Sequence, residues 1–392
     1  MYVKRELEGL IRKYLPKKEI IAVIGPRQSG KTTLVKHILS DLSNVNVVTF
    51  DDVEILNLFQ NDIKSFIALY VAGYDYIFID EVQYAKESGR QLKYIYDTTA
   101  AKLIISGSSS AEISVQSLKY LVGRIFIFEL YPFNFREFLL AKGPKLLPIF
   151  EQKKFGQEIE KRLALHIQKF VSYGGYPRVV LSDDYEEKKN ILKNIYSTLI
   201  LREVKDLFGI AESQSLIKLV KALALQIGNL INYSELCDIS GFKFSKLKAS
   251  VSILEKVFIA NRCYPFSSNK RNELVKNPKI YFVDTGLRNV IVNDFKDERT
   301  DSGALYENLI YSEYLKKGKK LNYWRTKSGA EVDFIDESIP LEIKLTPKIG
   351  KSLHSFIAKY SPEKAFVVSG RNAASKKVKN TEIGFVSFAK FL

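Results

Sequence analysis

Residues 20–39 read IIAVIGPRQSGKTTLVKHIL, and this stretch decides the fold of the first part of the chain. Its centre, residues 25–32, matches the pattern G-x-x-x-x-G-K-T. The apolar run of residues 20–24 predicts a buried parallel strand, and the amphipathic residues that follow Lys31 predict a helix. A strand, a glycine-rich loop and a helix in this order are typical of a site that binds phosphate groups.

The chemistry of this loop accounts for its residue types. Glycine at two positions lets backbone N–H groups approach an anion without a Cβ in the way, and the helix directs its positive end at the same point. Lys31 can reach the β- and γ-phosphates, and the Thr32 hydroxyl suits Mg²⁺. A turn rich in Gly and Ser could match by chance, but the order of strand, loop and helix favours phosphate binding. The residues predicted to bind ATP are Gly25, Pro26, Arg27, Gln28, Ser29, Gly30, Lys31, Thr32 and Thr33.

A second apolar strand, residues 76–79, ends in Asp80 and Glu81. A carboxylate at the C-terminal end of a strand beside the phosphate-binding loop can hold Mg²⁺ through water, so we expect Asp80 to serve the magnesium ion of ATP. The next carboxylate can polarise the attacking water, which makes Glu81 the predicted general base. Acidic turns after strands are common, but this one follows a phosphate-binding loop, and the pair favours an ATPase site.

A third apolar strand begins at Lys102 and leads into the serine-rich residues 106–110. A hydroxyl at that point can sense the γ-phosphate, and Ser108 is our choice, although a serine-rich loop needs no such role. Arg124 lies between this strand and the next helical block. It can reach a nucleotide held by a neighbouring subunit and neutralise transition-state charge, or it can pair with a surface carboxylate. The sequence leaves both roles of Arg124 open.

Length and composition define the class of protein. A chain of 392 residues is too long for one core, so we expect roughly two to four domains. A hydrophobic content of 46% and an aromatic content of 12% exclude a largely disordered chain. No apolar stretch reaches transmembrane length, and the two cysteines lack metal-type spacing. We therefore expect a cytoplasmic protein without a membrane partner.

The net charge of +16 is distributed unevenly along the chain. Residues 1–140 carry 17 basic and 16 acidic side chains, whereas residues 141–392 carry 43 basic and 28 acidic ones. A strongly basic second half suggests a polyanionic partner, and DNA is the leading candidate. A solvated basic face, or a face suited to anionic lipid, would carry similar charge.

The middle of the chain predicts two further modules. Residues 151–205 look helical and suit a lid over the nucleotide. Residues 213–285 have the layout of a winged helix, in which the second helix, capped by Ser245, has Ser250 on its exposed face. Winged helices also serve as protein-binding modules, so the layout alone does not prove DNA contact. The residues predicted to contact DNA are Lys246, Lys248, Lys270 and Arg271.

A further constellation lies near the C-terminus. Asp333 falls on one predicted strand, and Glu342 and Lys344 fall two apart on one face of the next. Carboxylates so placed can bind one or two Mg²⁺ or Mn²⁺ ions, and a lysine beside them can orient water for phosphodiester hydrolysis. Glu307 could complete this metal site, although Glu313 lies nearer to the apolar stripe of the same predicted helix. A surface Glu–Lys pair on an edge strand, or a retired nuclease, would look the same.

The whole chain resembles prokaryotic and archaeal AAA-type ATPases that carry an uncharacterised C-terminal domain of PD-(D/E)XK nuclease-like character. The resemblance implies an ASCE-type (AAA+) P-loop core that works as a homo-oligomer, with a hexamer as one arrangement. It implies that Lys31, Glu81, Ser108 and Arg124 are catalytic, with Arg124 as a subunit-spanning finger. It also implies nuclease-like positions at Glu307, Asp333, Glu342 and Lys344, although Val332 stands where that motif's Pro–Asp element would need Pro. The motifs that carry the resemblance are GPRQSGKTT (25–33), FIDEVQ (78–83), SGSSS (106–110), LVGR (121–124), LYPFNFREF (130–138), GGYP (174–177), PKIYFVDTGL (278–287), GAEVDFI (329–335) and LEIKL (341–345).

Together these patterns predict an α/β protein in four parts. They are a P-loop core at 1–140, a helical lid at 141–208, a winged-helix domain at 209–298 and a restriction-endonuclease-like α/β domain at 299–392. The predicted function is ATP hydrolysis coupled to binding and processing of duplex or branched DNA, with Mg²⁺ and ATP as cofactors. The competing prediction is a signalling or defence switch whose C-terminal domain is an interaction module.

Overall fold

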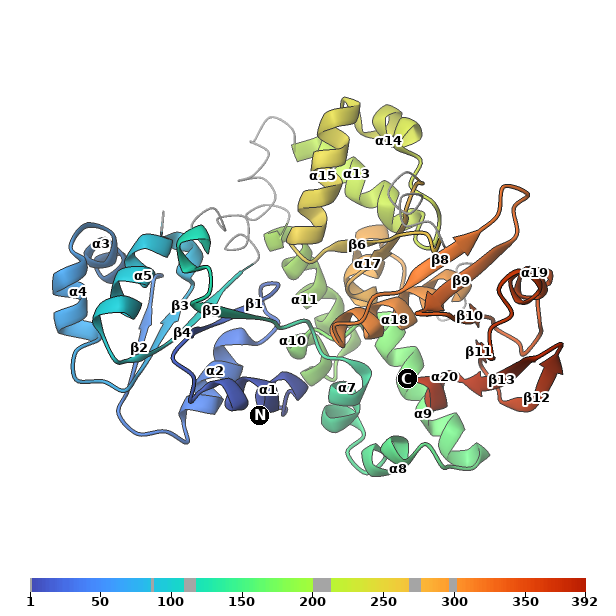
Figure 1. Ribbon diagram of the computed structural model, residues 1–392, viewed down its shortest axis with the longest axis horizontal. Helices are drawn as coiled ribbons and strands as arrows, with labels where there is room; N and C mark the ends of the chain where they lie inside the picture. Colours follow the sequence, from blue (N-terminus) through green and yellow to red (C-terminus); the bar gives the residue numbers. More distant parts are fainter. Residues whose placement is uncertain (1, 86–87, 109–117, 200–212, 268–275, 296–301) are drawn as a thin grey trace. The chain divides into compact units, whose positions relative to one another are not determined.

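The computed structural model describes residues 2–85, 88–108, 118–199, 213–267, 276–295 and 302–392, which form two compact units. The first unit comprises the described residues up to Phe133 together with Lys256–Phe258. The second comprises the other described residues from Asn134 onward. Figure 1 traces both units along the chain. The four predicted domain boundaries remain predictions.

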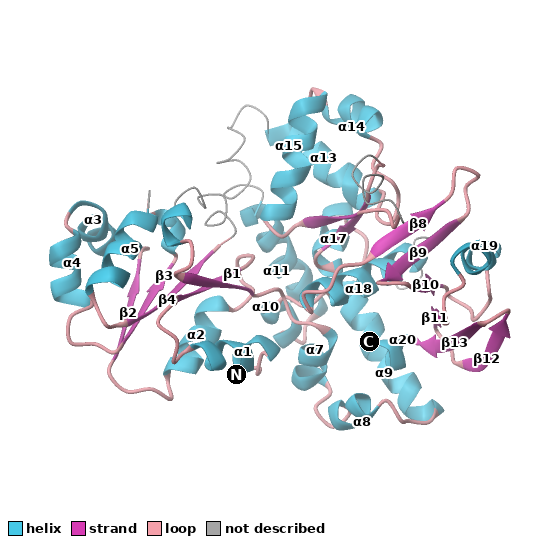
Figure 2. Cartoon of the chain, viewed as in Figure 1, coloured by secondary structure: helices cyan, strands magenta, loops and turns pink. Residues whose placement is uncertain are grey.

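The first unit is built on a sheet of five parallel strands. The strand order is β2-β3-β4-β1-β5, so β4 lies between β1 and β3. Figure 2 distinguishes these strands from the helices around them. The strands are β1 (Ile20–Ile24), β2 (Val45–Thr49), β3 (Tyr76–Asp80), β4 (Lys102–Gly107) and β5 (Ile125–Glu129), and the helices are α1 (Glu6–Tyr14), α2 (Lys31–Leu39), α3 (Val53–Asn61), α4 (Ile63–Tyr70), α5 (Ser88–Thr98), η1 (Val82–Tyr84) and η3 (Leu118–Leu121).

Helices cover both faces of this sheet. Since successive residues of a strand point to opposite sides, each strand contributes side chains to two cores. In β1, Ile20 and Ala22 pack with the core formed by α3, α4 and α5. Ile21 and Val23 pack instead with the core formed by α1 and α2. All five residues of β1 are buried, as the continuous apolar run predicted. The result is a three-layer α/β/α arrangement around a parallel sheet.

The second unit begins with a series of helices and a pair of antiparallel strands, β6 and β7, after which one more helix follows. Asn134 and Glu137 form a reciprocal capping box at the start of the first helix, and Asp284 caps the last one. The elements are α7 (Phe135–Lys142), α8 (Leu147–Gln152), α9 (Gln157–Tyr173), α10 (Pro177–Leu181), α11 (Tyr185–Thr198), α13 (Ser213–Leu225), α14 (Tyr233–Ser240), α15 (Phe244–Lys256), β6 (Ala260–Cys263), β7 (Lys279–Phe282) and α17 (Thr285–Val292).

Two of the quoted motifs meet at a close backbone approach within this unit. A Cβ on Gly286 would lie 2.1 Å from the Tyr173 carbonyl oxygen, and a Cβ on Gly174 would lie 2.0 Å from Asp284 Oδ1. Asp284 also accepts a 2.7 Å hydrogen bond from the Gly175 backbone N–H. The motifs GGYP and PKIYFVDTGL are therefore matched to each other, and glycine is required where they touch.

The rest of the second unit is a mixed six-stranded sheet in the order β12-β13-β11-β10-β9-β8. Strand β11 pairs in parallel with both β10 and β13. The other pairs, β10 with β9, β9 with β8 and β13 with β12, are antiparallel. The elements are α18 (Ser302–Lys316), β8 (Asn322–Arg325), β9 (Glu331–Asp336), β10 (Ile339–Ile343), α19 (Lys351–Tyr360), β11 (Lys364–Ser369), β12 (Ala373–Val378), β13 (Thr381–Ser387) and α20 (Phe388–Phe391).

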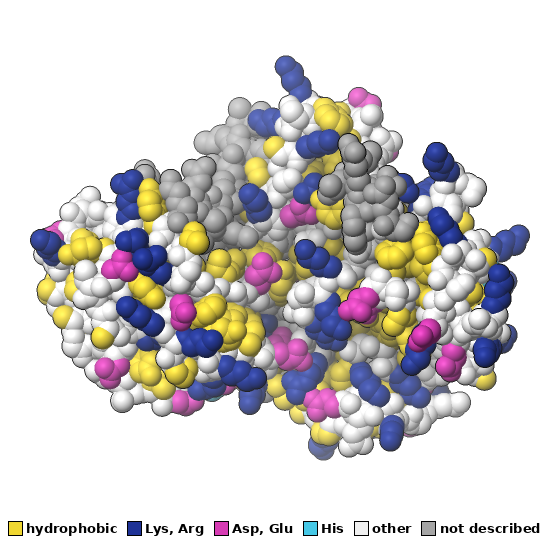
Figure 3. Space-filling model, viewed as in Figure 1, with side chains coloured by type: hydrophobic (Ala, Val, Ile, Leu, Met, Phe, Trp, Pro, Cys, Tyr) yellow, Lys and Arg dark blue, Asp and Glu magenta, His cyan; other side chains and the backbone are white. Residues whose placement is uncertain are grey.

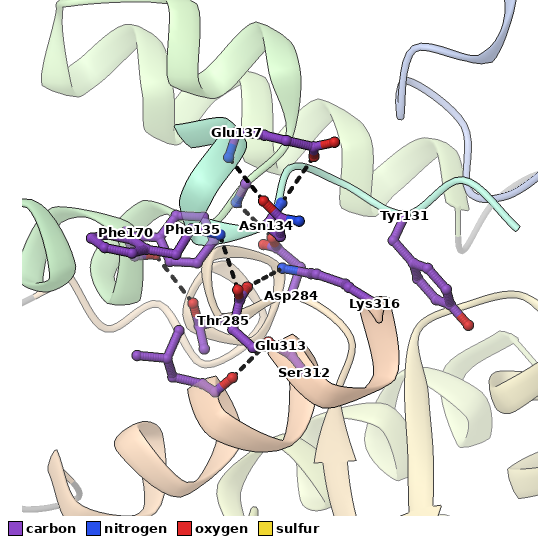
Figure 4. A network of polar contacts seen from close by, with 12 residues as sticks. Tyr131, Asn134, Phe135, Glu137, Phe170, Asp284, Thr285, Ser312, Glu313 and Lys316 are labelled. Atoms are coloured by element: carbon purple, nitrogen blue, oxygen red, sulfur yellow. Dashed lines mark hydrogen bonds and ion pairs between the residues drawn. The ribbon is translucent and has the colours of Figure 1, made fainter. Parts of the chain in front are cut away.

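Glu313, the alternative to Glu307 on α18, has a structural role. It is 3% exposed, accepts a 3.0 Å hydrogen bond from the Phe135 backbone N–H and lies 3.4 Å from the Lys316 ammonium. Figure 4 shows Glu313 pointing toward Phe135 and Lys316. Glu313 therefore joins α18 to the start of α7, and of the two glutamates it is Glu307 that faces the C-terminal sheet.

The segment predicted as a winged helix contains its three helices and an antiparallel strand pair in the predicted order. The winged-helix assignment remains a prediction, because two features of β7 differ from a wing strand that is open to solvent. All four residues of β7 are buried, and β7 is held to α18 by paired hydrogen bonds of 2.7 Å between the Asn308 side chain and the Phe282 backbone. Ser250, predicted to be exposed, is buried and bonded to the Lys246 carbonyl at 2.8 Å, because it lies one turn from the apolar Leu247.

Candidate functional site

The phosphate-binding loop connects β1 to α2 in the first unit. Gly25 has φ +155° and Gly30 has φ +96°, and α2 starts directly afterwards at Lys31. A Cβ on Gly25 would lie 2.1 Å from the Leu130 carbonyl oxygen, so the loop passes the end of β5 at a distance that only glycine allows. No side chain among the described residues caps the N-terminus of α2, which leaves its first N–H groups facing the loop.

Lys31 and Ser29 line this loop. The Lys31 ammonium donates to the carbonyl oxygens of Gly25 at 2.9 Å and of Pro26 at 3.0 Å. Ser29 Oγ is buried, and none of the described residues forms a hydrogen bond with it. Arg5, which the sequence interpretation missed, braces the loop from α1's N-terminal side by donating to the Ser29 carbonyl at 2.8 Å. Lys31 is therefore held on the loop that it is predicted to share with the phosphates.

The predicted magnesium residues are in contact. The Thr32 hydroxyl, in the first turn of α2, donates a 2.8 Å hydrogen bond to Asp80 Oδ2 at the end of β3. Ser106 Oγ, from β4, donates to the other oxygen of the same carboxylate. Asp80 is 8% exposed. The strand order explains this meeting, because β4 lies between β1 and β3 and brings Ser106 between the two motifs. Sequence reasoning chose Ser108 in this loop and missed Ser106.

Glu81 is held by a neighbour two residues further on. Its backbone is left-handed, with φ +56°, and its carboxylate accepts a hydrogen bond from Gln83 Nε2. Gln83 Oε1 in turn accepts from the Ser108 backbone N–H at 3.2 Å. Gln83 thus connects the predicted base at the end of β3 with the predicted sensor after β4. No local pattern in the sequence indicated this link.

Arg124 lies just before β5, at the N-terminal end of the parallel strands and away from the phosphate-binding loop. Its carbonyl accepts from the Ile20 backbone N–H at the start of β1, whereas the phosphate-binding loop follows the end of β1. The Arg124 guanidinium lies 3.3 Å from Asp97 Oδ1. Within one chain, Arg124 therefore pairs with a carboxylate, which is one of the two roles that the sequence left open. A role toward a second subunit remains a prediction.

These residues fit Mg-ATP by two independent observations. The close approach at Gly25 shapes a loop with no room for a side chain there, and the buried Ser29 hydroxyl has no hydrogen-bond partner among the residues that the structure describes. Lys31 and the N-terminus of α2 would hold the phosphates, and Thr32 and Asp80 would hold the magnesium ion.

Comparison with known families finds a match to this part of the chain. A family model described as an AAA domain matches residues 17–139. These residues are therefore similar to an AAA-type P-loop ATPase domain. The predicted α/β P-loop core is thereby confirmed. Two family models described as domains of unknown function match residues 165–298 and 302–388.

Several known proteins are similar to this chain over most of its length. An uncharacterized protein of Methanocaldococcus jannaschii is 27% identical over 92% of this chain and 83% of its own length. An uncharacterized protein of Haemophilus influenzae is 26% identical over 66% of this chain and 62% of its own length. A solved structure described as a Walker-type ATPase of Pyrococcus abyssi is 16% identical over 74% of this chain and 96% of that chain, with a TM-score of 0.49.

The C-terminal constellation also comes together, on the mixed sheet of the second unit. Lys344 lies 3.7 Å from Asp333 Oδ2 and 4.0 Å from Glu342 Oε2. Asp333 accepts a 2.7 Å hydrogen bond from the Ile343 backbone N–H, which joins β9 to β10. Burial raises the pKa of Glu342. Burial would lower the pKa of Lys344, but Asp333 and Glu342 raise it overall.

Glu307 reaches the same region from α18. Burial, followed by repulsion from Asp333, raises the pKa of Glu307 to about 8. Tyr281, from β7, donates a 3.2 Å hydrogen bond to Glu307 Oε2. Lys279, also from β7, lies 4.0 Å from the same oxygen and 2.5 Å from Glu331 Oε1. Sequence reasoning missed Lys279 and Tyr281, because β7 lies outside the segment in which the pattern was recognised. It also missed Glu331, which lies on β9 inside that segment.

As they are arranged, the carboxylates of this cluster do not fit a divalent cation. In the described parts of the chain, no three His, Cys, Asp or Glu side chains gather in a way that could hold a metal ion. The ammonium groups of Lys279 and Lys344 stand beside the carboxylate oxygens instead.

The predicted DNA-contacting residues are only partly described. Lys248 on α15 is exposed and lies 4.6 Å from the Phe244 ring, and Lys246 is partly exposed. Lys270 and Arg271 lie outside the described residues. On the face drawn in Figure 3, Lys and Arg side chains are scattered and do not form a single stripe. None of the described helices has the length and apolar character needed to cross a membrane.

Proposed function

We propose that this chain binds Mg-ATP with residues 25–33 and Asp80 and hydrolyses it with Glu81 as the general base. The hydrogen bond from Thr32 to Asp80 carries the proposal, because it joins two predicted magnesium ligands that come from different elements, helix α2 and strand β3. It forms at the C-terminal edge of a parallel sheet, where ligands of open α/β folds bind.

Each residue has a separate task in this proposal. Bound Mg-ATP supplies the phosphoanhydride bond and a cation that neutralises charge on the phosphate oxygens. Lys31 turns from the loop carbonyls toward the phosphates and offsets negative charge there. Glu81 accepts the proton of the attacking water, and Gln83 fixes the orientation of the Glu81 carboxylate.

Nucleotide binding and steady-state hydrolysis test this proposal. Lys31→Ala should lose nucleotide binding, because that ammonium is the one the phosphate-binding motif directs at the γ-phosphate. Lys36→Ala, later on the same helix, is the matched control and should bind normally. Equal nucleotide affinity of Lys31→Ala and the wild type would contradict the assignment of the site.

We further propose that ATP hydrolysis serves binding and remodelling or processing of DNA. The support is the excess of basic over acidic side chains in residues 141–392, together with Lys246 and Lys248 at the solvent-facing part of α15. Because phosphate contacts release counterions, affinity for DNA should fall steeply with salt. The variant that carries Lys246→Ala, Lys248→Ala, Lys270→Ala and Arg271→Ala should bind DNA more weakly and ATP normally.

A panel of single-stranded, duplex and branched DNA distinguishes this role from a signalling or defence switch. Stimulation of ATP hydrolysis by any of these supports DNA processing. Complete indifference to nucleic acid favours the switch, in which the nucleotide state would control an interaction module. Assembly into a homo-oligomer, with Arg124 acting on a neighbour, belongs to the same proposal and is tested by mixing Arg124→Ala with Lys31→Ala subunits for recovered activity.

The nuclease-like character of residues 299–392 also remains a proposal. The proximity of Asp333, Glu342 and Lys344 supports it. Incubation of the three DNA forms with Mg²⁺ or Mn²⁺ tests it, and cleavage that Asp333→Ala abolishes without loss of ATP hydrolysis would support it. The ammonium groups of Lys279 and Lys344 beside these carboxylates lead us to expect no metal-dependent cleavage in this experiment.

A further inference from the structure

A buried lysine ends inside the carboxylate cluster of the C-terminal sheet. Lys279, the first residue of β7, is 2% exposed. Its ammonium lies 2.5 Å from Glu331 Oε1 on β9 and 4.0 Å from Glu307 Oε2 on α18. An ammonium group at this depth is costly unless carboxylates compensate it, so the position of Lys279 depends on these two partners.

Every carboxylate of the cluster has a cation of the same chain beside it. Glu307 and Glu331 are within 4.0 Å of Lys279. Asp333 and Glu342 are within 4.0 Å of Lys344. A third cation, Arg325, lies 3.3 Å from Glu331 Oε2 at the exposed side. Four carboxylates therefore share three cations of the same chain, which leaves little negative charge to attract a divalent ion.

Neutral donors occupy further oxygens of these carboxylates. The Tyr281 hydroxyl donates to Glu307 at 3.2 Å, and the Ile343 backbone N–H donates to Asp333 at 2.7 Å. Glu342 Oε2 has no hydrogen-bond partner within the described ranges, but a Cβ on Gly350 would lie 3.1 Å from it, so the backbone at the N-cap of α19 covers this oxygen. A metal ion would have to displace several of these contacts at once.

We propose that Lys279 is the resident cation of this cluster, where it joins β7 to α18 and β9 and stands where a divalent metal would otherwise be needed. The cluster then binds no Mg²⁺ or Mn²⁺, and any contact of this unit with nucleic acid is one of binding without metal-assisted cleavage. The inference is independent of the ATPase site, since it involves only residues of the second unit.

Manganese binding to the full chain without nucleotide tests the first part. Free Mn²⁺ is followed by its electron paramagnetic resonance signal for the wild type and for Asp333→Asn. Any ion bound near Thr32 and Asp80 is common to both proteins, so the difference reports the cluster alone. We expect identical titrations. One additional ion bound by the wild type and lost in Asp333→Asn would overturn the proposal.

Thermal unfolding of charge-matched variants tests the role of Lys279. Glu331→Gln should lower the melting temperature of the wild type, because it leaves the buried ammonium without its nearest partner. In Lys279→Met, which keeps the side-chain volume, the same change should have no further effect or should raise the melting temperature. Lys279→Arg, which keeps the charge, should be the mildest of the Lys279 variants.

Lys102→Met is the matched control, since Lys102 is 7% exposed and donates to backbone carbonyls in the first unit. In that background Glu331→Gln should lower the melting temperature as it does in the wild type. Additive effects of Lys279→Met and Glu331→Gln would show that Lys279 acts by packing alone and would overturn its role as a counter-ion. If Lys279→Met does not fold, the comparison of Mn²⁺ titrations still decides the proposal.

Discussion

The Thr32 hydroxyl lies 2.8 Å from Asp80 Oδ2, so the first turn of α2 and the end of β3 share a hydrogen bond although one strand separates β1 from β3. The intervening strand contributes to the contact, because Ser106 from β4 donates to the other oxygen of Asp80. Asp80 is therefore held from two sides before any cation binds. This arrangement makes the carboxylate geometry depend on both hydroxyls.

The first prediction concerns these two hydroxyls. Thr32→Ala should lower the rate of Mg²⁺-dependent ATP hydrolysis about tenfold or more, because it removes both a predicted ligand and a hydrogen bond that fixes Asp80. Ser106→Ala should have a smaller effect, since it removes only the hydrogen bond. Thr98→Ala, at the end of α5, is the control. Rates measured against Mg²⁺ concentration check the order, and a Thr32→Ala enzyme with unchanged Mg²⁺ dependence would refute it.

The second prediction concerns Glu81. Glu81→Gln should bind ATP with near-normal affinity and hydrolyse it about a hundredfold more slowly or worse, because an amide cannot accept the proton of water. Nucleotide affinity and single-turnover rates are measured separately on the same preparation. Glu54→Gln, on the exposed side of α3, should behave as the wild type does. Wild-type turnover by Glu81→Gln would require a different base.

The strongest parts of the fold could be predicted because they depend on local sequence. The apolar run of β1 and the glycines after it fix a strand, a loop and a helix within residues 20–39. The contacts made by Ser106 and Gln83 could not be predicted, since they depend on which strands become neighbours. Strand order is set by pairing between segments far apart in the chain, and no window of sequence contains it.

The C-terminal cluster shows the same limit. Alternation along the two predicted strands placed Asp333 on one and Glu342 and Lys344 on the next. The structure brings the carboxylates of Asp333 and Glu342 within 4.0 Å of the Lys344 ammonium. The sequence pattern did not indicate the other cation of the cluster, Lys279, because it comes from a strand more than fifty residues earlier in the chain. Helical periodicity likewise placed Glu313 nearer to the apolar stripe of α18, and that position proved to be a buried contact with Phe135.

The third prediction compares two glycines. Gly25→Ala should abolish nucleotide binding or destabilise the first unit, because its Cβ would lie 2.1 Å from the Leu130 carbonyl oxygen. Gly9→Ala, inside α1, has nothing within 4 Å of the new Cβ and should stabilise the unit by about 0.5–1 kcal/mol through helix propensity. Thermal unfolding and nucleotide affinity of both variants provide the check. A Gly25→Ala protein that binds ATP and melts like the wild type would contradict the role of this close approach.

The fourth prediction is a dependence of stability on pH through His166 in α9. Burial, reinforced by the nearby Lys169, lowers the pKa of His166 below its ordinary value of 6.5, and the buried Nδ1 has no hydrogen-bond partner in the described part of the chain. A group whose pKa is lowered by folding contributes stability above its unfolded value, and this contribution is lost as the pH falls through the lowered folded value. Denaturant unfolding of the second unit should therefore show a free energy of unfolding that decreases as the pH falls below about 6.5. His166→Phe, which keeps a ring against Phe138, should flatten this decrease, while His354→Phe at an exposed position should preserve it. An identical pH profile for the wild type and His166→Phe would show that His166 is not the titrating group.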